Sequence, residues 1–128
     1  MVIVDSNVWI RYLRDPDGET GSALQTLLDT DQVLMTGVVL AEVLQGARTE
    51  REYGALLTRL TALPYGEMSK QTWASAGLIA LQLRMQGRLT PLTDLAIGAL
   101  ALEGGHEVFS LDGHFDRIDQ LMRYSPAS

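Results

Sequence analysis

The sequence predicts an α/β fold with a central, mainly parallel sheet of short strands flanked by helices. Short, largely apolar segments recur at 2–4, 32–35 and 107–110, and the first of them, Val-Ile-Val, is typical of a strand that is buried on both faces. Longer stretches with helical periodicity separate these segments, and such alternation favours a parallel sheet. The 128 residues contain no internal repeat, low-complexity segment or linker, so we expect one domain over 1–128.

The first strand ends in an acid. Val2, Ile3 and Val4 lead directly to Asp5, and a helix-compatible run follows over 8–13. In open α/β sheets, ligands bind beyond the carboxyl ends of the strands, which makes Asp5 a candidate functional residue. The alternative is local, because an acid or serine at this point also caps the helix that follows.

Helix start signals divide the rest of the chain. Capping residues stand at Thr36, Thr49, Ser69 and Thr90, and the last is followed by Pro91, which is favoured in the first helical turn. From these signals and the apolar periodicity we expect helices over 22–30, 37–47, 49–60, 69–86 and 90–103, a break at 62–65, a helical turn at 114–116 and a last edge strand at 121–124.

Asp94 is the acid that is hardest to explain as a surface residue. It shares a face with Ile97, Gly98 and Ala101 on a helix that has almost no other polar residue. Burying a lone carboxylate costs several kcal/mol unless it is paired. An acid in the first helical turn gains about 0.3–1 kcal/mol from the helix dipole, but that gain does not require Asp94 to face the core.

Glu42 and Asp112 extend the set of candidate acids. Glu42 points away from the apolar stripe of its helix, and Asp112 follows the third strand. Taken singly, each of them is equally explained as a solvated helix or turn residue, as is Asp116. Because the carboxyl ends of parallel strands lie along one edge, we expect both to converge there with Asp5 and Asp94.

Converged carboxylates repel one another unless a cation lies between them. Oxygen ligands, in a chain with no cysteine and two histidines, select a hard cation such as Mg²⁺, with Mn²⁺ as a substitute. Such a centre activates water and stabilises charge on a phosphate, as in metal-dependent phosphodiester hydrolysis. Walker A, GxGxxG and nucleophile-elbow motifs are absent, and we expect His106 and His114 at the surface.

The composition excludes several other classes. The lack of cysteine excludes disulfides, thiolate metal sites and a cysteine nucleophile, and it fits a cytoplasmic location. The longest uncharged apolar run, 95–102, is too short to cross a bilayer, which takes about 20 residues, and we see no signal peptide. The net charge of −6 argues against tight non-specific binding to nucleic acid, although acids that hold a cation weaken this argument.

Four segments together resemble the PIN domain, and within that family the VapC-type ribonuclease toxins of prokaryotic toxin–antitoxin pairs. They are VIVDSNVW at 2–9, VLAEV at 39–43, TDLAIGA at 93–99 and SLDGHF at 110–115, and in order they cover essentially the whole chain. The resemblance implies a three-layer α/β/α PIN-like domain. It also implies an endoribonuclease, dependent on Mg²⁺ or Mn²⁺, in which a metal-activated water hydrolyses RNA.

The resemblance assigns roles to individual residues. The catalytic acids are Asp5, Glu42, Asp94 and Asp112, of which Asp5, Asp94 and Asp112 hold the metal; Ser6, Asn7 and Ser110 are supporting polar positions. It also implies a small antitoxin partner and a homodimer. Ser110 stands where threonine is common. His114 stands where many relatives carry another acid, which argues against a metal role for that position and against a second metal.

Among the arginines, Arg11 and Arg48 are the first candidates for contacts to RNA phosphates. Two alternative functions remain. One is a phosphatase with Asp5 as nucleophile, against which Asn7 stands where a second acid is expected. The other is a noncatalytic PIN-like binding or regulatory domain, against which the presence of all four acids argues.

Overall fold

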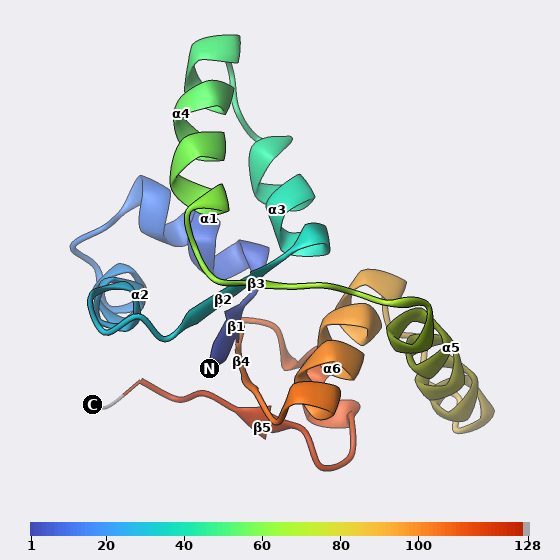
Figure 1. Ribbon diagram of the computed structural model, residues 1–128. Coiled ribbons are helices and arrows are strands. Elements are labelled where there is room, and N and C mark those ends of the chain that lie inside the picture. Colours follow the sequence, from blue (N-terminus) through green and yellow to red (C-terminus); the bar gives the residue numbers. More distant parts are fainter. Residues whose placement is uncertain (127–128) are drawn as a thin grey trace.

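The computed structural model describes residues 1–126, in which five strands form one sheet among six α-helices and a 3₁₀ helix (Figure 1). The strands are β1 (Val2–Val4), β2 (Val33–Thr36), β3 (Tyr65–Gly66), β4 (Glu107–Phe109) and β5 (Met122–Arg123). The helices are α1 (Ser6–Arg14), α2 (Glu19–Asp29), α3 (Gly37–Leu44), α4 (Glu50–Thr61), α5 (Lys70–Met85), α6 (Leu92–Gly104) and the 3₁₀ helix η1 (Gly113–Arg117).

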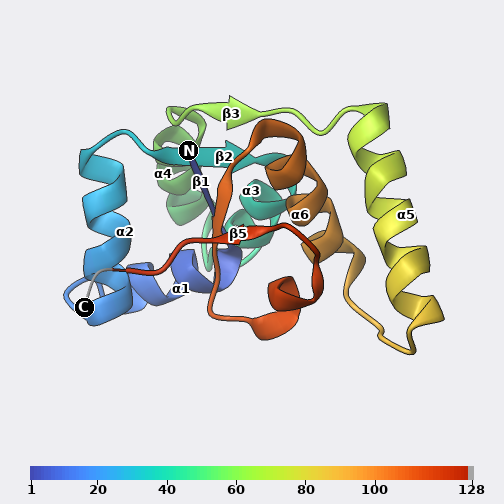
Figure 2. The same ribbon diagram turned by 90° about the horizontal axis from the view of Figure 1, so that it is seen from below.

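The strand order is β3-β2-β1-β4-β5, and every neighbouring pair is parallel. The central strand β1 places Ile3 between Leu34 of β2 and Val108 of β4. Apart from Glu107 and Thr36, these three strands are apolar, and all their residues except Glu107 are buried, because helices cover both sides of the sheet, with α2 on one side and α5 and α6 on the other (Figures 1 and 2). The predicted α/β class with a parallel sheet is confirmed.

Side-chain capping follows the prediction at two of four helix starts. The hydroxyl of Thr49 accepts from the third backbone N–H of α4, and Ser69 forms a reciprocal capping box with α5. Thr36 occupies the cap position of α3, but its side chain makes no capping bond. At α6 the cap position belongs to Pro91 rather than to Thr90. The predictions that Thr36 and Thr90 cap through their side chains are therefore wrong.

The predicted break at 62–65 follows the end of α4 at Thr61, and it contains the start of β3, a two-residue edge strand too short to leave a periodic signal. On α5, Ala76 and Leu83 are buried and pack against α6, whereas Trp73 is 44% exposed. Within residues 1–126, every helix is too short or too polar to span a membrane.

The core position of β1 predicts that truncating Ile3 and truncating Ile10 lower the free energy of unfolding by very different amounts. Ile3 is 0% exposed and Ile10 on α1 is 38% exposed. We expect Ile3→Ala to lower the free energy of unfolding by about 2–5 kcal/mol, because it leaves a cavity in the centre of the sheet. Ile10→Ala should cost less than about 1 kcal/mol. Urea unfolding of both variants tests this, and equal losses would contradict the placement of β1.

Candidate active site

Asp5 is a buried acid that closes β1 and opens α1. Its backbone N–H donates to the carbonyl of Phe109 at 2.9 Å, which extends the pairing of β1 with β4. Its Oδ1 accepts from the backbone N–H of Ser6 at 2.8 Å, so the predicted capping role is confirmed. Its Oδ2 accepts from the Ser110 hydroxyl at 2.7 Å. One carboxylate thus caps the helix and faces the end of the neighbouring strand.

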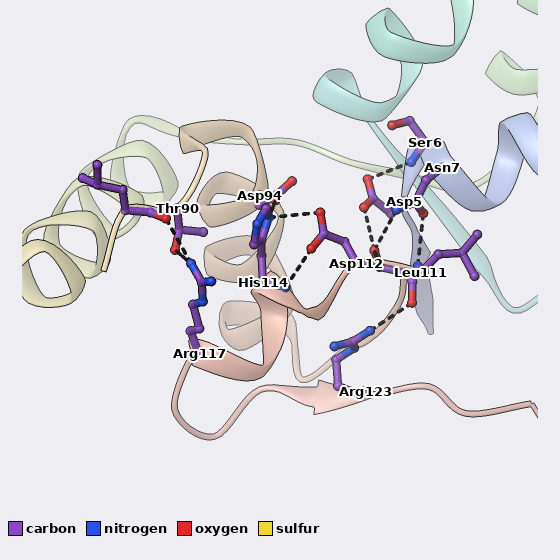
Figure 3. A network of polar contacts seen from close by, with 12 residues as sticks. Asp5, Ser6, Asn7, Thr90, Asp94, Leu111, Asp112, His114, Arg117 and Arg123 are labelled. Atoms are coloured by element: carbon purple, nitrogen blue, oxygen red, sulfur yellow. Dashed lines mark hydrogen bonds and ion pairs between the residues drawn. The ribbon is translucent and has the colours of Figure 1, made fainter. Parts of the chain in front are cut away.

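Ser110 and Asn7 hold the two strand ends together (Figure 3). Besides donating to Asp5, the Ser110 hydroxyl accepts from Asn7 Nδ2 at 3.2 Å and from the backbone N–H of Asp112 at 3.0 Å. Asn7 Oδ1 accepts from the N–H of Leu111 at 3.2 Å. The hydroxyl therefore uses its proton and both lone pairs, and it fixes the backbone that leads to Asp112.

Asp94, Asp112 and His114 form the closest group of possible ligands. Asp94 lies in the first turn of α6, and Asp112 caps η1 by accepting from the N–H of His114 at 2.9 Å. His114 Nδ1 lies 3.0 Å from Asp94 Oδ2 and 3.0 Å from Asp112 Oδ2 (Figure 3). One ligand atom from each residue lies within 4.8 Å of the other two.

The sequence predicts His114 at the surface rather than in the site. The structure leaves 32% of the His114 side chain exposed and places its imidazole between Asp94 and Asp112. The available signal was the spacing of Asp112 and His114, two residues apart in one short turn, at a position where the resemblance leads one to expect an acid. Composition alone gives no such signal, because a single histidine fits many surface turns.

The acids influence one another electrostatically. Burial raises the pKa of the Asp5 carboxyl, and the charges of Asp94 and Asp112 raise it further, against hydrogen bonds that lower it. Burial also raises the pKa of Glu42, as do the charges of Asp5 and Asp94, while a hydrogen bond from the Ser6 side chain lowers it. All four predicted acids therefore lie at one edge of the sheet, although Asp5 and Glu42 are outside the closest group.

The donor set fits a divalent cation. Asp5, Glu42, Asp94 and Asp112 form no ion pair with a lysine or arginine anywhere in the part of the chain that the structure describes. Within residues 1–126, Asp94 and Asp112 contact the His114 imidazole, and none of the four acids contacts a lysine or arginine. Carboxylate oxygens are ligands that suit Mg²⁺ or Mn²⁺. Such a centre polarises a phosphate and activates water.

Four other charged residues bear on the predictions for this site. Arg11 and Arg48 are exposed, and Arg48 lines a groove of about 300 Å³ between α1, α3 and α4. Asp116 pairs with Arg123 at 2.7 Å rather than with the acids. Arg123, which the sequence did not indicate, also donates to the carbonyl of Ser110 at 2.9 Å and lies 5.7 Å from the ring centroid of Phe115. Arg123 therefore stabilises the segment that carries Asp112 and His114.

Removing the Ser110 hydroxyl should destabilise the fold. In Ser110→Ala, Asp5 Oδ2 and the N–H of Asp112 both lose a partner, so we expect the free energy of unfolding to fall by about 1–3 kcal/mol. Ser125→Ala, at an exposed serine, should have little effect. Urea unfolding measures both, and equal stabilities of the two variants would show that the network does not hold the strand ends.

The raised pKa of Asp5 predicts a pH-dependent stability in metal-free protein. The folded chain keeps this proton at pH values where the unfolded chain has lost it. Stability therefore falls as pH rises from the ordinary range of aspartate through the raised pKa. Asp5→Asn lacks this titration, so its free energy of unfolding relative to the native chain should rise over that window, by at most about 1.4 kcal/mol per pH unit. A pH-independent difference in urea unfolding would contradict the burial of a charge at Asp5.

Comparison with known proteins agrees with this architecture. Curated proteins give no match. Among solved structures, VapBC2 of Rickettsia felis bound to a promoter DNA fragment is 18% identical with a TM-score of 0.80, covering 97% of this chain and 98% of that chain. DNA-bound VapBC of Salmonella typhimurium is 20% identical with a TM-score of 0.80, covering 96% of each. VapC20 of Mycobacterium tuberculosis, a sarcin–ricin loop cleaving toxin, is 16% identical with a TM-score of 0.72, covering 98% of this chain and 100% of that chain.

At such identities, structural likeness shows the fold. The sequence itself carries the assignment further, because a family model described as the PIN domain matches residues 2–121. That range contains strands β1 to β4 of the parallel sheet and all four acids at its edge. The predicted PIN-like fold is confirmed, and this chain belongs to the PIN-domain family.

Proposed function

We propose that this protein is a divalent-metal-dependent endoribonuclease and the toxin of a toxin–antitoxin pair. One observation carries the proposal: Asp94 and Asp112 lie with His114 in one group beside the buried Asp5, and neither lysine nor arginine compensates the acids within residues 1–126. A PIN domain with this arrangement suits a cation and a phosphodiester. Several structural neighbours are described as toxin–antitoxin complexes, and one as a toxin that cleaves RNA at the sarcin–ricin loop.

In this proposal, Asp5, Asp94 and Asp112 would hold Mg²⁺, or Mn²⁺ in its place. The bound ion supplies Lewis-acid activation of water and neutralises charge on the scissile phosphate. Ser110 and the N–H of Ser6 keep the Asp5 carboxylate in one orientation. The raised pKa of Glu42 suits it to accept a proton from the attacking water. Hydrolysis without the 2′-hydroxyl leaves a 5′-phosphate and a 3′-hydroxyl.

The proposed substrate is single-stranded or looped RNA. Arg11 and Arg48 are exposed and are the first candidates for phosphate contacts. A net charge of −6 disfavours non-specific binding to RNA. The shape of the RNA and a few positioned cationic side chains would therefore select the target. Because the substrate is RNA, we expect the protein to act in the cytoplasm.

A small antitoxin is the proposed partner. The groove that contains Arg48 is lined mostly by apolar residues of α1, α3 and α4, together with Arg14 and Glu52. A segment bound there would cover Arg48 and compete with RNA. A homodimer is also proposed, since the outer side of α5 exposes Trp73, Leu78, Leu81 and Met85, and burying such a face is favourable.

The two alternatives explain less of the site. Asn7 stands where an Asp-nucleophile phosphatase needs an acid, and both polar atoms of its amide are engaged, one with Ser110 and one with the N–H of Leu111. A noncatalytic domain does not need acids held together at an energetic cost. If the protein bound no Mn²⁺, a noncatalytic domain would be favoured.

The test is cleavage of cellular RNA by purified protein with Mg²⁺ or Mn²⁺. We expect cleavage that stops with chelator and falls at least about 100-fold in Asp94→Asn, because a charge that stabilises the reacting phosphate is lost. Asp119→Asn, at an exposed acid without a polar partner in the described residues, is the matched control and should cleave like the native chain. End mapping should give 5′-phosphates. Cleavage that Asp94→Asn retains in full would be contamination and would refute the assignment.

A further inference from the structure

We propose that His114 is itself a ligand of the divalent cation, so that the centre is a mixed nitrogen and oxygen site that favours Mn²⁺ over Mg²⁺. The inference rests on the metal-dependent function proposed above. His114 is one of two histidines in the chain. The other, His106, lies at the opposite edge of the sheet beside the N-terminus.

The first argument is the spacing of the ligand atoms. Nδ1 of His114 lies 3.0 Å from an oxygen of Asp94 and 3.0 Å from an oxygen of Asp112. An octahedral ion with bonds of about 2.1 Å sets neighbouring ligand atoms about 3.0 Å apart. The nitrogen therefore has the separation from both oxygens that shared coordination requires.

The second argument is the number of protons. Nδ1 carries at most one hydrogen, and that hydrogen points along one direction in the plane of the ring. The contact with Asp94 has hydrogen-bond geometry, whereas the contact with Asp112 Oδ2 is only a close approach of nitrogen and oxygen. A hydrogen bond satisfies one carboxylate and leaves the second facing the same nitrogen. A cation among the three atoms satisfies all of them.

The third argument is that the ring is held in place. The N–H of His114 donates to Asp112 Oδ1, which occupies one carboxylate oxygen with the backbone and leaves Oδ2 toward the ring. The next residue, Phe115, is completely buried and anchors the turn in the core. About a third of the imidazole side chain remains exposed, so an ion can reach it from solvent. The ligand is thus positioned before the ion binds.

The choice of metal follows from the nitrogen. Mg²⁺ prefers oxygen ligands and gives up its water reluctantly, whereas a neutral imidazole is a good ligand for first-row transition metals. Replacing one carboxylate of an all-oxygen centre with imidazole therefore weakens Mg²⁺ relative to Mn²⁺. It also leaves one negative charge fewer in the centre, which further disfavours the harder ion.

The test is pulsed electron paramagnetic resonance of Mn²⁺ bound to the untagged full-length protein. We expect a directly coupled ¹⁴N signal in the native chain and in the control His106→Asn, and its loss in His114→Asn. Equilibrium titrations should show Mn²⁺ affinity about 10- to 100-fold lower in His114→Asn. His114→Asp, which restores an oxygen ligand, should bind Mg²⁺ at least as well as the native chain and have a smaller preference for Mn²⁺.

The outcomes separate this inference from the proposed function. Mn²⁺ binding without nitrogen coupling, together with metal-dependent RNA cleavage, would overturn the role of His114 and leave the nuclease intact. Failure of the native chain to bind Mn²⁺ would overturn both. If His114→Asn did not fold by circular dichroism, coupling that persists in His106→Asn would still identify His114, since no other histidine remains.

Discussion

The hydrogen bond from Ser110 to Asp5 joins the two central strands at the edge where the acids lie. Asp5 closes β1 and opens α1, while Ser110 follows β4 and opens the segment that carries Asp112 and His114. Because the same hydroxyl accepts from the N–H of Asp112, a shift of either strand end moves the acids relative to one another. The pairing of β1 with β4 therefore determines the geometry of the site through Ser110, with Asn7 as a second link between the strand ends.

This contact also holds a charge where burial disfavours it. Hydrogen bonds to a charged group contribute about 1.5–3 kcal/mol each, and Asp5 accepts two. Burial and the charges of Asp94 and Asp112 act in the opposite direction, and the raised pKa of Asp5 shows that they prevail. The site is thus a region where the fold is less stable than it would be with neutral side chains. A ligand that binds only the folded chain and neutralises these acids stabilises it by mass action.

The sequence indicates Asp5 and Asp112 because strand ends are visible in local patterns, and parallel strands bring their ends to one edge. Capping is less predictable, since it depends on competing partners. Thr90 accepts a hydrogen bond from Arg117, 27 residues later, instead of capping α6. The position of His114 likewise depends on tertiary contacts, because its partner Asp94 lies 20 residues earlier on a different element. Local sequence propensity reveals neither the partner of Thr90 nor the partner of His114, because both lie far away in the sequence.

The turn η1 can present ligands because its other side is fixed in the core. Phe115 is fully buried, and Arg123 of the edge strand β5 lies over its ring and donates to the carbonyl of Ser110. Asp116 completes this support by pairing with Arg123. Since ligand atoms must be held to within a few tenths of an ångström, a five-residue turn alone is too mobile for the task. The short C-terminal strand therefore acts on the site indirectly, by fixing the turn that carries Asp112 and His114.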